Sequence, residues 1–297
     1  MSSEGAEVAA SPVSLAEACR LLAAAPGLRP VAGGTDLMVA GPLERAAERR
    51  VVDVSRIAEL HGIEETADGG VALGAATTFA AIRRHPLIAA RYPALTSAAG
   101  VVGGWQIQTR ATLGGNMANA SPAGDSLPVL LALGATVVVA GAAGGREIER
   151  EIAYDDFHVG YRATALAAGE LIVRVLLPPP AAGSRQAFRK VGTREAQAIS
   201  KLVVAMVGRV ADGAVAGLRL AAGSVAATPV RLHAAERAAL GRPCGEATAA
   251  AAGEAAAGEV EPIDDVRSTA DYRRAVLGRV VRRLVLTLGA GGGEGTP

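Results

Sequence analysis

Apolar positions recur along this chain at two spacings, one typical of helices and the other typical of strands. Leu15, Ala18, Leu21 and Leu22 share one face of a predicted helix over residues 14–25, and Ser14 is placed to cap it. The same spacing predicts helices over residues 78–84, 93–102, 126–133, 230–240, 247–257 and 271–288, with Pro86 ending the first. Short runs rich in β-branched residues predict strands over 29–32, 51–54, 70–74, 135–140, 146–150 and 171–177. Polar interruptions predict a loop over residues 103–120.

The pattern changes after three consecutive prolines at residues 178–180, which resist regular structure and are followed by Ala, Ala, Gly and Ser. Beyond them, longer strands are predicted over residues 186–190, 201–210 and 214–222, with Asp212–Gly213 as a hairpin turn. We therefore predict one domain over residues 1–180, a second over 181–290, and a disordered tail over 291–297.

Composition argues against several classes of function. Thirty basic and twenty-nine acidic residues give a net charge of +1, and only 3% of residues are aromatic. Nucleic-acid binders need a basic face or stacking aromatic side chains, so nucleic acid is not an expected partner. The two cysteines are too few for an iron–sulfur cluster, which needs about four thiolates. The four histidines are scattered, so no protein-bound metal is expected.

Two further segments bear on where in the cell the protein is expected. The first twelve residues lack a basic stretch followed by an apolar run, so they do not resemble a signal peptide. Residues 126–145 are uncharged and long enough for a membrane span, but Pro128 and several glycines divide them into a predicted helix and strand. The sequence therefore predicts a cytoplasmic protein.

Two glycine turns stand out as candidate anion-binding sites. The first joins Ala32, Gly33, Gly34, Thr35 and Asp36 at the start of a possible short helix, and the second joins Thr112, Leu113, Gly114, Gly115 and Asn116. Glycine pairs admit positive φ, so their backbone N–H groups can form an anion-binding nest. Neither turn has the spacing of a Rossmann fingerprint or a P-loop. Each could be an ordinary turn, since the chain holds 37 glycines, but two together could clasp a diphosphate.

Four segments, taken with these turns, resemble the FAD-binding medium subunits of the xanthine dehydrogenase and carbon monoxide dehydrogenase group, the molybdenum hydroxylases. They are QIQTRATLGGNMANASPAGDSLPVLLALGA (106–135), DFHVGYRATALAAGELIVRVLLP (156–178), FRKVGTREAQAISK (188–201) and DDVRSTADYRRAVLGRVVRRL (264–284). The resemblance implies an α+β fold: a two-lobed FAD-binding domain of the vanillyl-alcohol-oxidase/PCMH type, followed by a C-terminal α+β domain.

The resemblance also implies which residues hold FAD. The two turns would surround the pyrophosphate, Asp125 would bond to the hydroxyl-bearing chain of the cofactor, and Lys190 would approach the flavin. No histidine falls in these motifs, so FAD is expected to bind non-covalently. The cofactor-binding candidates are Ala32, Gly33, Gly34, Thr35, Asp36, Val102, Thr112, Gly114, Gly115, Asn116, Ser121, Asp125, Leu171 and Lys190.

The implied activity is electron transfer, with no catalytic acid or base on this chain. An iron–sulfur small subunit would supply electrons from a molybdenum-cofactor large subunit, in a heterotrimer, and NAD, oxygen or a quinone would accept them. One alternative is a stand-alone FAD-dependent oxidoreductase, for which His158 or Tyr161 would be the base. Another is a non-catalytic assembly or scaffold subunit that has lost its flavin.

Simpler structural roles remain open for single residues. Asp125 could cap the helix that begins at Ser126, and Lys190 could lie at a strand edge. Trp105 is as well explained by packing as by contact with a flavin. The arginines of the last predicted helix are expected on a solvated face; they are Arg273, Arg274, Arg282 and Arg283.

Overall fold

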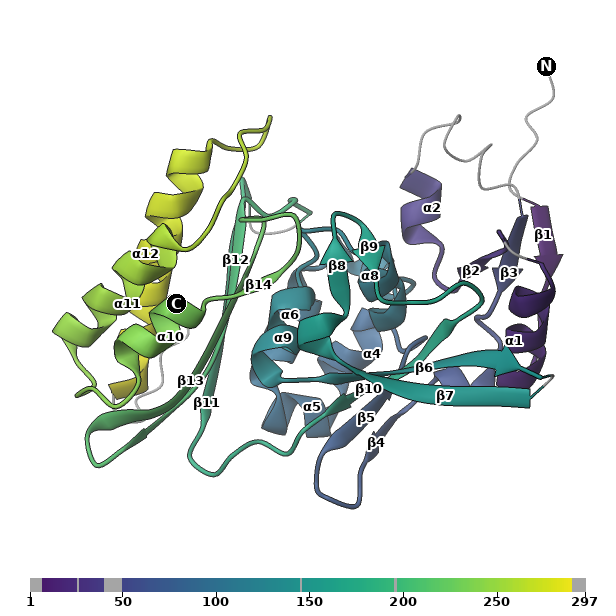
Figure 1. Cartoon of the computed structure of the whole chain (residues 1–297), viewed down its shortest axis with the longest axis horizontal. Coiled ribbons are helices and arrows are strands. Elements are labelled where there is room, and N and C mark those ends of the chain that lie inside the picture. The colour runs from purple at the N-terminus through teal and green to yellow at the C-terminus, as the bar shows by residue number, and fades with distance from the viewer. Residues whose placement is uncertain (1–6, 26, 40–49, 145, 195–196, 290–297) are drawn as a thin grey trace.

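The computed structural model describes residues 7–25, 27–39, 50–144, 146–194 and 197–289, and Figure 1 shows their arrangement. They form three main sheets with helices packed against them, and a small two-stranded sheet. This mixture of sheets and helices confirms the predicted α+β class. The predicted tail over 291–297 lies outside the described residues. Within the described part of the chain, no helix has the length and apolar character needed to cross a membrane.

The first sheet is parallel and has the strand order β1-β3-β2. Helix α1 (Leu15–Ala24) packs beside it, and the Ser14 hydroxyl accepts a hydrogen bond from the Glu17 N–H, which confirms the predicted cap. Leu15, Ala18 and Leu22 are buried in the small core against this helix, as their spacing predicts, whereas Leu21 is only partly buried. The strands are β1 (Glu7–Ala10), β2 (Arg29–Val31) and β3 (Arg50–Asp53).

The second sheet is antiparallel and has the order β4-β5-β10-β6-β7, which includes the predicted β6–β7 hairpin. Its strands are β4 (Ile63–Glu65), β5 (Val71–Gly74), β6 (Thr136–Ala143), β7 (Arg146–Ala153) and β10 (Leu171–Leu177). The largest core lies between this sheet and the helices α4 (Phe79–Arg84), α5 (Pro86–Arg91), α6 (Pro93–Val101) and α9 (Leu127–Leu133).

The third sheet follows the prolines and has the order β11-β12-β13-β14. Val204 and Met206 of β12 face the C-terminal helices, whereas Ala205 between them faces the core around α9, so both faces of this sheet are buried. Asp212 and Gly213 have φ of 51° and 74°, as the predicted hairpin turn requires. The elements are β11 (Arg185–Val191), β12 (Leu202–Ala211), β13 (Ala214–Gly223), β14 (Val230–Arg231), α10 (His233–Ala239), α11 (Glu246–Gly258) and α12 (Ala270–Gly289).

Two sequence predictions about elements are wrong. Residues 103–120 are not a loop, because they contain α7 (Trp105–Gln108) and α8 (Leu113–Asn119). The helix predicted from residue 230 begins only at His233, after the strand β14. Helix α4 ends at Arg84, before Pro86, as predicted. The sequence did not predict α5, in which Pro86 occupies the first position, where a missing N–H costs no hydrogen bond.

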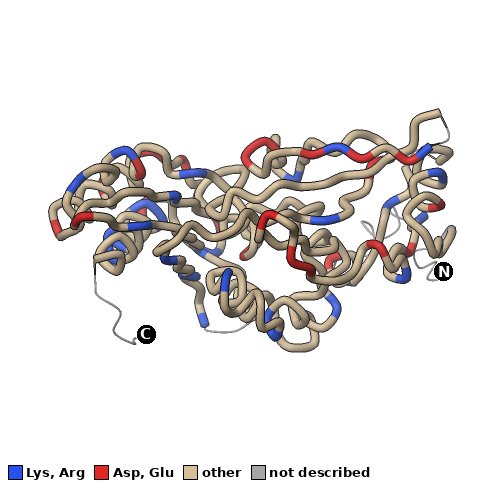
Figure 2. Tube along the Cα trace, turned by 90° about the horizontal axis from the view of Figure 1, so that it is seen from below, with Lys and Arg blue, Asp and Glu red and all other residues tan. Residues whose placement is uncertain are grey.

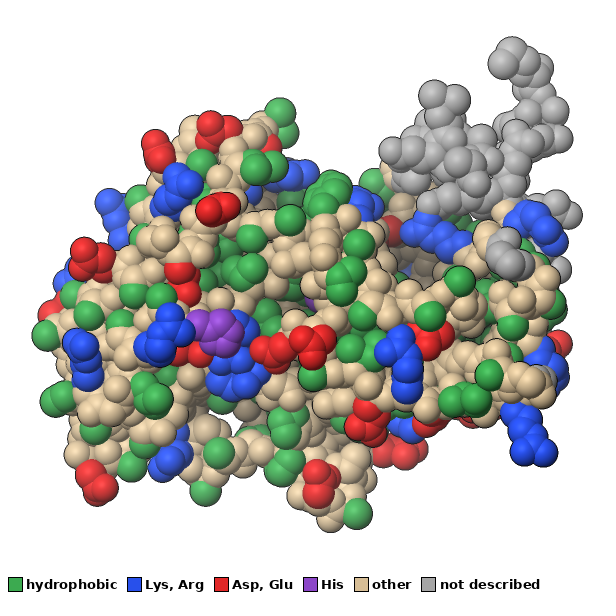
Figure 3. Space-filling view, in the orientation of Figure 1, with side chains coloured by type: hydrophobic (Ala, Val, Ile, Leu, Met, Phe, Trp, Pro, Cys, Tyr) green, Lys and Arg blue, Asp and Glu red, His purple; other side chains and the backbone are tan. Residues whose placement is uncertain are grey.

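Acidic and basic residues are interspersed along the chain trace (Figure 2). A cluster of them joins the second and third sheets, where Asp155 accepts from Arg219 at 3.2 Å and pairs with Arg231 at 3.4 Å. Basic and acidic side chains lie side by side on this face in Figure 3. The prediction that the arginines of α12 lie on a solvated face is wrong for Arg273. This side chain is buried and donates a hydrogen bond to Asp265 at 2.6 Å.

Candidate functional site

The first glycine turn lies between β2 and the short helix α2 (Thr35–Val39). Gly34 has a φ of +70°, a conformation that L side chains rarely adopt. Gly33 has a different requirement, because a Cβ built on it would lie 1.9 Å from the Arg110 carbonyl oxygen. The first turn therefore packs directly on the backbone that leads into the second turn, which brings the two motifs together.

The second glycine turn begins helix α8, with Thr112 as its N-cap. The Thr112 hydroxyl accepts from the Gly115 N–H at 3.1 Å. Leu113 and Gly114 donate their N–H groups to the carbonyl oxygens of Thr77 and Ala75, at 3.0 and 2.8 Å. These amides hold the turn against the segment that follows β5. The idea that this turn forms a backbone anion nest is therefore wrong, because its amides already have acceptors.

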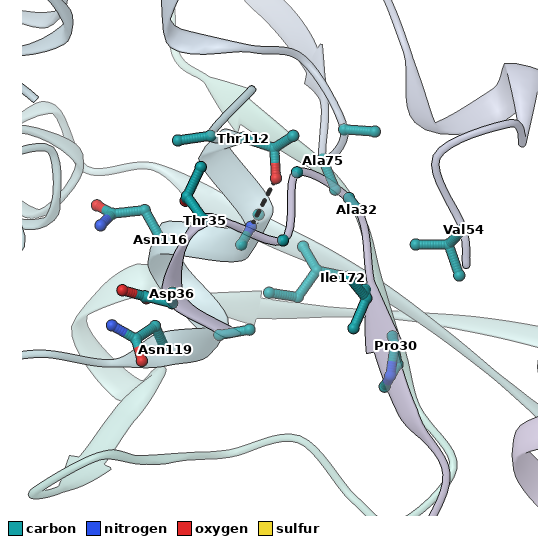
Figure 4. A pocket seen from close by; sticks show the side chains of 18 of the residues that line it. Pro30, Ala32, Thr35, Asp36, Val54, Ala75, Thr112, Asn116, Asn119 and Ile172 are labelled. Atoms are coloured by element: carbon teal, nitrogen blue, oxygen red, sulfur yellow. Dashed lines mark hydrogen bonds between the residues drawn. The ribbon is translucent and has the colours of Figure 1, made fainter. Parts of the chain in front are cut away.

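A cavity of about 380 Å³ opens between the two turns. Figure 4 shows polar side chains on one side of it, from Thr35, Asp36, Asn116 and Asn119. Apolar side chains, including Val54, Ala75 and Ile172, form the other side. This separation suits a ligand with a polar portion and a flat apolar portion.

Two hydrogen bonds orient the amide side chains of α8. Asn116 Oδ1 accepts from the buried Ser126 hydroxyl at 2.7 Å, which couples α8 to the start of α9. Asn119 Oδ1 accepts from Arg162 at 3.1 Å. With both carbonyl oxygens engaged, the amide nitrogens of Asn116 and Asn119 keep donor capacity for a ligand.

Glu170 adds an acidic side chain to the lining of the cavity. Both of its carboxylate oxygens accept from Arg150 at 2.7 Å, and one also accepts from the Ala167 N–H. The Arg150 hydrogen bond lowers the pKa of Glu170. This carboxylate is therefore ionised at neutral pH but already balanced by a cation.

Eleven of the fourteen candidate residues line this cavity, and their contact with a cofactor stays a prediction. They are Ala32, Gly33, Gly34, Thr35, Asp36, Val102, Thr112, Gly114, Gly115, Asn116 and Leu171. Ser121, Asp125 and Lys190 do not line it. The loop that holds Ser121 and Asp125 packs instead on the third sheet, where Ser224 donates its N–H to the Pro122 carbonyl oxygen.

Asp125 and Lys190 form a buried ion pair behind the cavity wall. Lys190 Nζ lies 2.6 Å from Asp125 Oδ2 and donates to the Val101 carbonyl oxygen at 3.0 Å, next to the lining residue Val102. Each side chain is only 9% exposed, and Asp125 Oδ1 has no hydrogen-bond partner. Burial raises the pKa of Asp125 to about 6, although Lys190 acts in the opposite direction. Asp125 is not the cap of α9, because Ser126 occupies that position. Lys190 does lie on β11, the edge strand of the third sheet, but its side chain is buried in the ion pair.

The residues proposed as a base for a stand-alone oxidoreductase lie outside the cavity lining. His158 Nε2 is hydrogen-bonded to the Tyr154 hydroxyl at 3.0 Å, and burial lowers the pKa of His158 to about 4. Tyr161 is exposed on the small β8–β9 sheet, formed by His158–Gly160 and Ala163–Thr164. Trp105 stacks with Arg84 at 5.2 Å and is also absent from the lining.

Sequence reasoning missed two parts of the site. Asn119 lies three residues after Asn116, so both share one helix face, but that signal appears only once α8 is recognised as a helix. The Arg150–Glu170 pair joins β7 to the residue before β10, and no periodicity predicts a contact across 20 positions.

Two family models match the chain. The FAD-binding domain in molybdopterin dehydrogenase matches residues 5–180, and the CO dehydrogenase flavoprotein C-terminal domain matches residues 186–288. The chain is 31% identical over 283 residues to the xanthine dehydrogenase FAD-binding subunit of Escherichia coli O157:H7, covering 95% of this chain and 96% of that protein. It is 32% identical to the nicotine 6-hydroxylase medium subunit of Paenarthrobacter nicotinovorans, with the same coverage.

Solved structures agree with these matches. The carbon monoxide dehydrogenase of Hydrogenophaga pseudoflava that lacks the Mo-pyranopterin moiety of its molybdenum cofactor gives a TM-score of 0.88 at 32% identity, covering 94% of this chain and 96% of that chain. Quinoline 2-oxidoreductase from Pseudomonas putida 86 gives 0.86 at 28% identity, covering 96% and 98%. The chain therefore belongs to the FAD-binding medium subunits of the molybdenum hydroxylase family, which are flavoprotein subunits of oxidoreductases.

Proposed function

We propose that this chain binds FAD non-covalently between its two glycine turns and relays electrons from partner iron–sulfur clusters to NAD, oxygen or a quinone. In this proposal it assembles in the cytoplasm with an iron–sulfur small subunit and a molybdenum-cofactor large subunit. Residues 1–180 form the FAD-binding domain and residues 181–290 the C-terminal domain. The observation that carries the proposal is the cavity that the two turns build together.

The residues around this cavity fit FAD. Hydroxyl and amide groups from Thr35, Thr112, Asn116 and Asn119 match the hydrogen-bonding needs of a diphosphate and a polyhydroxyl chain. The first turn complements them, because the first N–H groups of α2 have no acceptor inside that helix. The apolar side suits an aromatic ring system.

Bound FAD supplies both one-electron and two-electron transfer, so it suits a relay between clusters and a two-electron acceptor. The chain's own residues position the cofactor and set the polarity around it. Val102 lies at the wall behind which the Lys190–Asp125 pair is buried. We propose that this pair places the Lys190 ammonium, whose charge Asp125 balances, close to the flavin end of the cavity.

The relatives support assembly of this chain with other subunits, but they do not point to a single substrate. Their names refer to xanthine, nicotine and carbon monoxide, and the first two name an FAD-binding subunit and a medium subunit. A flavoprotein subunit that serves such different reactions fits a role in electron transfer, since the substrate is handled elsewhere.

The test is purification of the affinity-tagged chain from its native host. We expect one chain with iron–sulfur clusters and a larger chain with a molybdenum cofactor to co-purify in equal amounts. Stopped-flow reoxidation of the reduced complex with NAD, oxygen and a quinone would then identify the acceptor. A tagged chain that purifies alone, with full flavin and its own substrate oxidation, would favour the stand-alone oxidoreductase.

A further inference from the structure

Over the part of the chain that the structure describes, the charged groups that line the cavity include no cation at its polar side, where a diphosphate would lie. Among the described residues, the charged lining residues are Arg29, Asp36 and Glu170, and Glu170 is already paired with Arg150. Arg29 begins β2, about 13 Å of extended chain from Gly33. Figure 4 shows the neighbouring Pro30 away from the polar side chains. Asp36 adds a negative charge where an ionised diphosphate would lie.

Of the residues that the structure describes, Arg162 is the cation whose side chain forms a hydrogen bond to a residue on this polar side of the cavity. It occupies the turn between β8 and β9, where its φ of +51° places a non-glycine residue in the left-handed region. Its Nη1 donates to Asn119 Oδ1 at 3.1 Å, and Asn119 lines the cavity. Arg162 is exposed, and it forms no ion pair with any carboxylate in the described part of the chain.

We propose that Arg162 is a further cofactor-binding residue, which contacts the diphosphate of the dinucleotide from the β8–β9 turn. This inference rests on the proposed binding of FAD between the two glycine turns. The guanidinium has five N–H donors in a planar fork, and the bond to Asn119 uses only one of them. The remaining donors match phosphate oxygens, which arginine binds with two parallel hydrogen bonds.

The bond to Asn119 has a second consequence. It holds the guanidinium at the cavity rim and also fixes the Asn119 carbonyl oxygen away from an anionic ligand. Arg162 therefore brings a positive charge and orients a neutral donor beside it. The small β8–β9 sheet is then part of the cofactor site, although neither of its strands lines the cavity.

Substitutions of two other arginines serve as controls for the Arg162 variant. Arg110 follows α7, and its backbone touches the first glycine turn, but no hydrogen bond connects its side chain to the lining within the described residues. Arg237 is exposed on α10 in the C-terminal part of the chain. The substitutions are Arg162→Gln, Arg110→Gln and Arg237→Gln, each of which removes one positive charge.

The experiment measures the affinity of the flavin-depleted full chain for FAD, ADP and riboflavin by fluorescence titration and calorimetry. We expect Arg162→Gln to raise the Kd for FAD and ADP by about 10- to 100-fold and to reduce its dependence on salt. Riboflavin, which lacks the diphosphate, should bind equally to both proteins. The Arg110 and Arg237 variants should bind all three ligands like the wild type.

The outcomes distinguish a failure of this inference from a failure of the proposed function on which it rests. Wild-type protein that fails to bind FAD would overturn the proposed function itself. Wild-type binding that Arg162→Gln leaves unchanged would overturn only the role of Arg162. An effect of Arg162→Gln that vanishes in an Asn119→Ala background would also overturn direct contact, because Arg162 would then act only through Asn119. Arg162→Asn, which tolerates positive φ, serves as a second neutral variant if Gln perturbs folding.

Discussion

Glycine residues in the two turns are required for different physical reasons. At Gly34 an added Cβ would make only an ordinary contact, 3.7 Å from Val31 Cγ1, but φ is +70°. Gly114 has no room, since a Cβ would lie 2.7 Å from the Ala75 Cβ. A substitution at Gly114 would therefore disturb packing whether or not a cofactor binds. Gly34 is the better position for testing cofactor binding.

We expect Gly34→Val to weaken FAD binding at least about tenfold and to lower the free energy of unfolding by about 1–2 kcal/mol, because the turn must leave the left-handed region. Gly213→Val is the control, since Gly213 has a similar φ of +74° and open space in the β12–β13 turn. It should lose comparable stability but keep its FAD affinity in the same titration. Equal FAD loss in both variants would argue against a specific role for the first turn.

Asp125 and His158 have opposite effects on stability between about pH 4 and pH 6. Burial raises the pKa of Asp125 to about 6, so its contribution is present at low pH and is lost as the pH rises towards 6. Burial lowers the pKa of His158 to about 4, so its contribution is present above the unfolded value of about 6.5 and is lost on acidification through 4. In this range the two effects partly cancel.

We therefore expect Asp125→Asn to change the pH dependence of stability. The contribution of Asp125, of the order of 3 kcal/mol between pH 4 and pH 6, should disappear from the curve. The unfolding free energy of the variant should then fall more steeply than that of the wild type as the pH falls from 6 to 4. Chemical denaturation at several pH values measures this. Parallel curves for the two proteins would contradict the raised pKa of Asp125.

Helices and strands follow the sequence pattern wherever one period persists along the whole element. Strand β10 has the predicted bounds, and β12 and β13 differ from theirs by one residue at each affected end. Helix α8 was missed because its first turn contains two glycines, which have low helix propensity. In the structure, the Thr112 cap and the backbone contacts to Ala75 and Thr77 stabilise that turn instead.

The contact between α11 and α12 depends on two glycines. A Cβ on Gly253 would lie 2.5 Å from the Gly278 carbonyl oxygen, and one on Gly278 would lie 2.9 Å from the Gly253 carbonyl oxygen. Gly253→Ala should therefore lower the free energy of unfolding by about 1–3 kcal/mol through overpacking. Thermal unfolding measures this, and the FAD content should not change, because these helices form a core separate from the cavity.

Gly258→Ala on the same helix is the matched control, since nothing lies within 4 Å of the new Cβ. Its stability should stay the same or rise by up to about 1 kcal/mol, because alanine favours a helix over glycine. If both variants lost stability equally, close packing between α11 and α12 would not be the cause.

At the scale of the whole molecule, the sequence predicted the α+β class and the family, and the comparisons confirm both. The sequence did not predict the contacts that assemble the site. Gly33 and the Arg110 carbonyl oxygen lie far apart in the chain, and Lys190 of the third sheet reaches Asp125 across 65 positions. Such contacts follow from how the sheets and α9 pack together, and local periodicity carries no information about that packing.

The central claim is that this chain carries FAD. The most direct test is the visible absorption spectrum of the purified full chain, followed by identification of the compound released on denaturation. The account predicts a yellow protein with two flavin bands that releases intact FAD without proteolysis. A colourless protein that also fails to take up added FAD would contradict it.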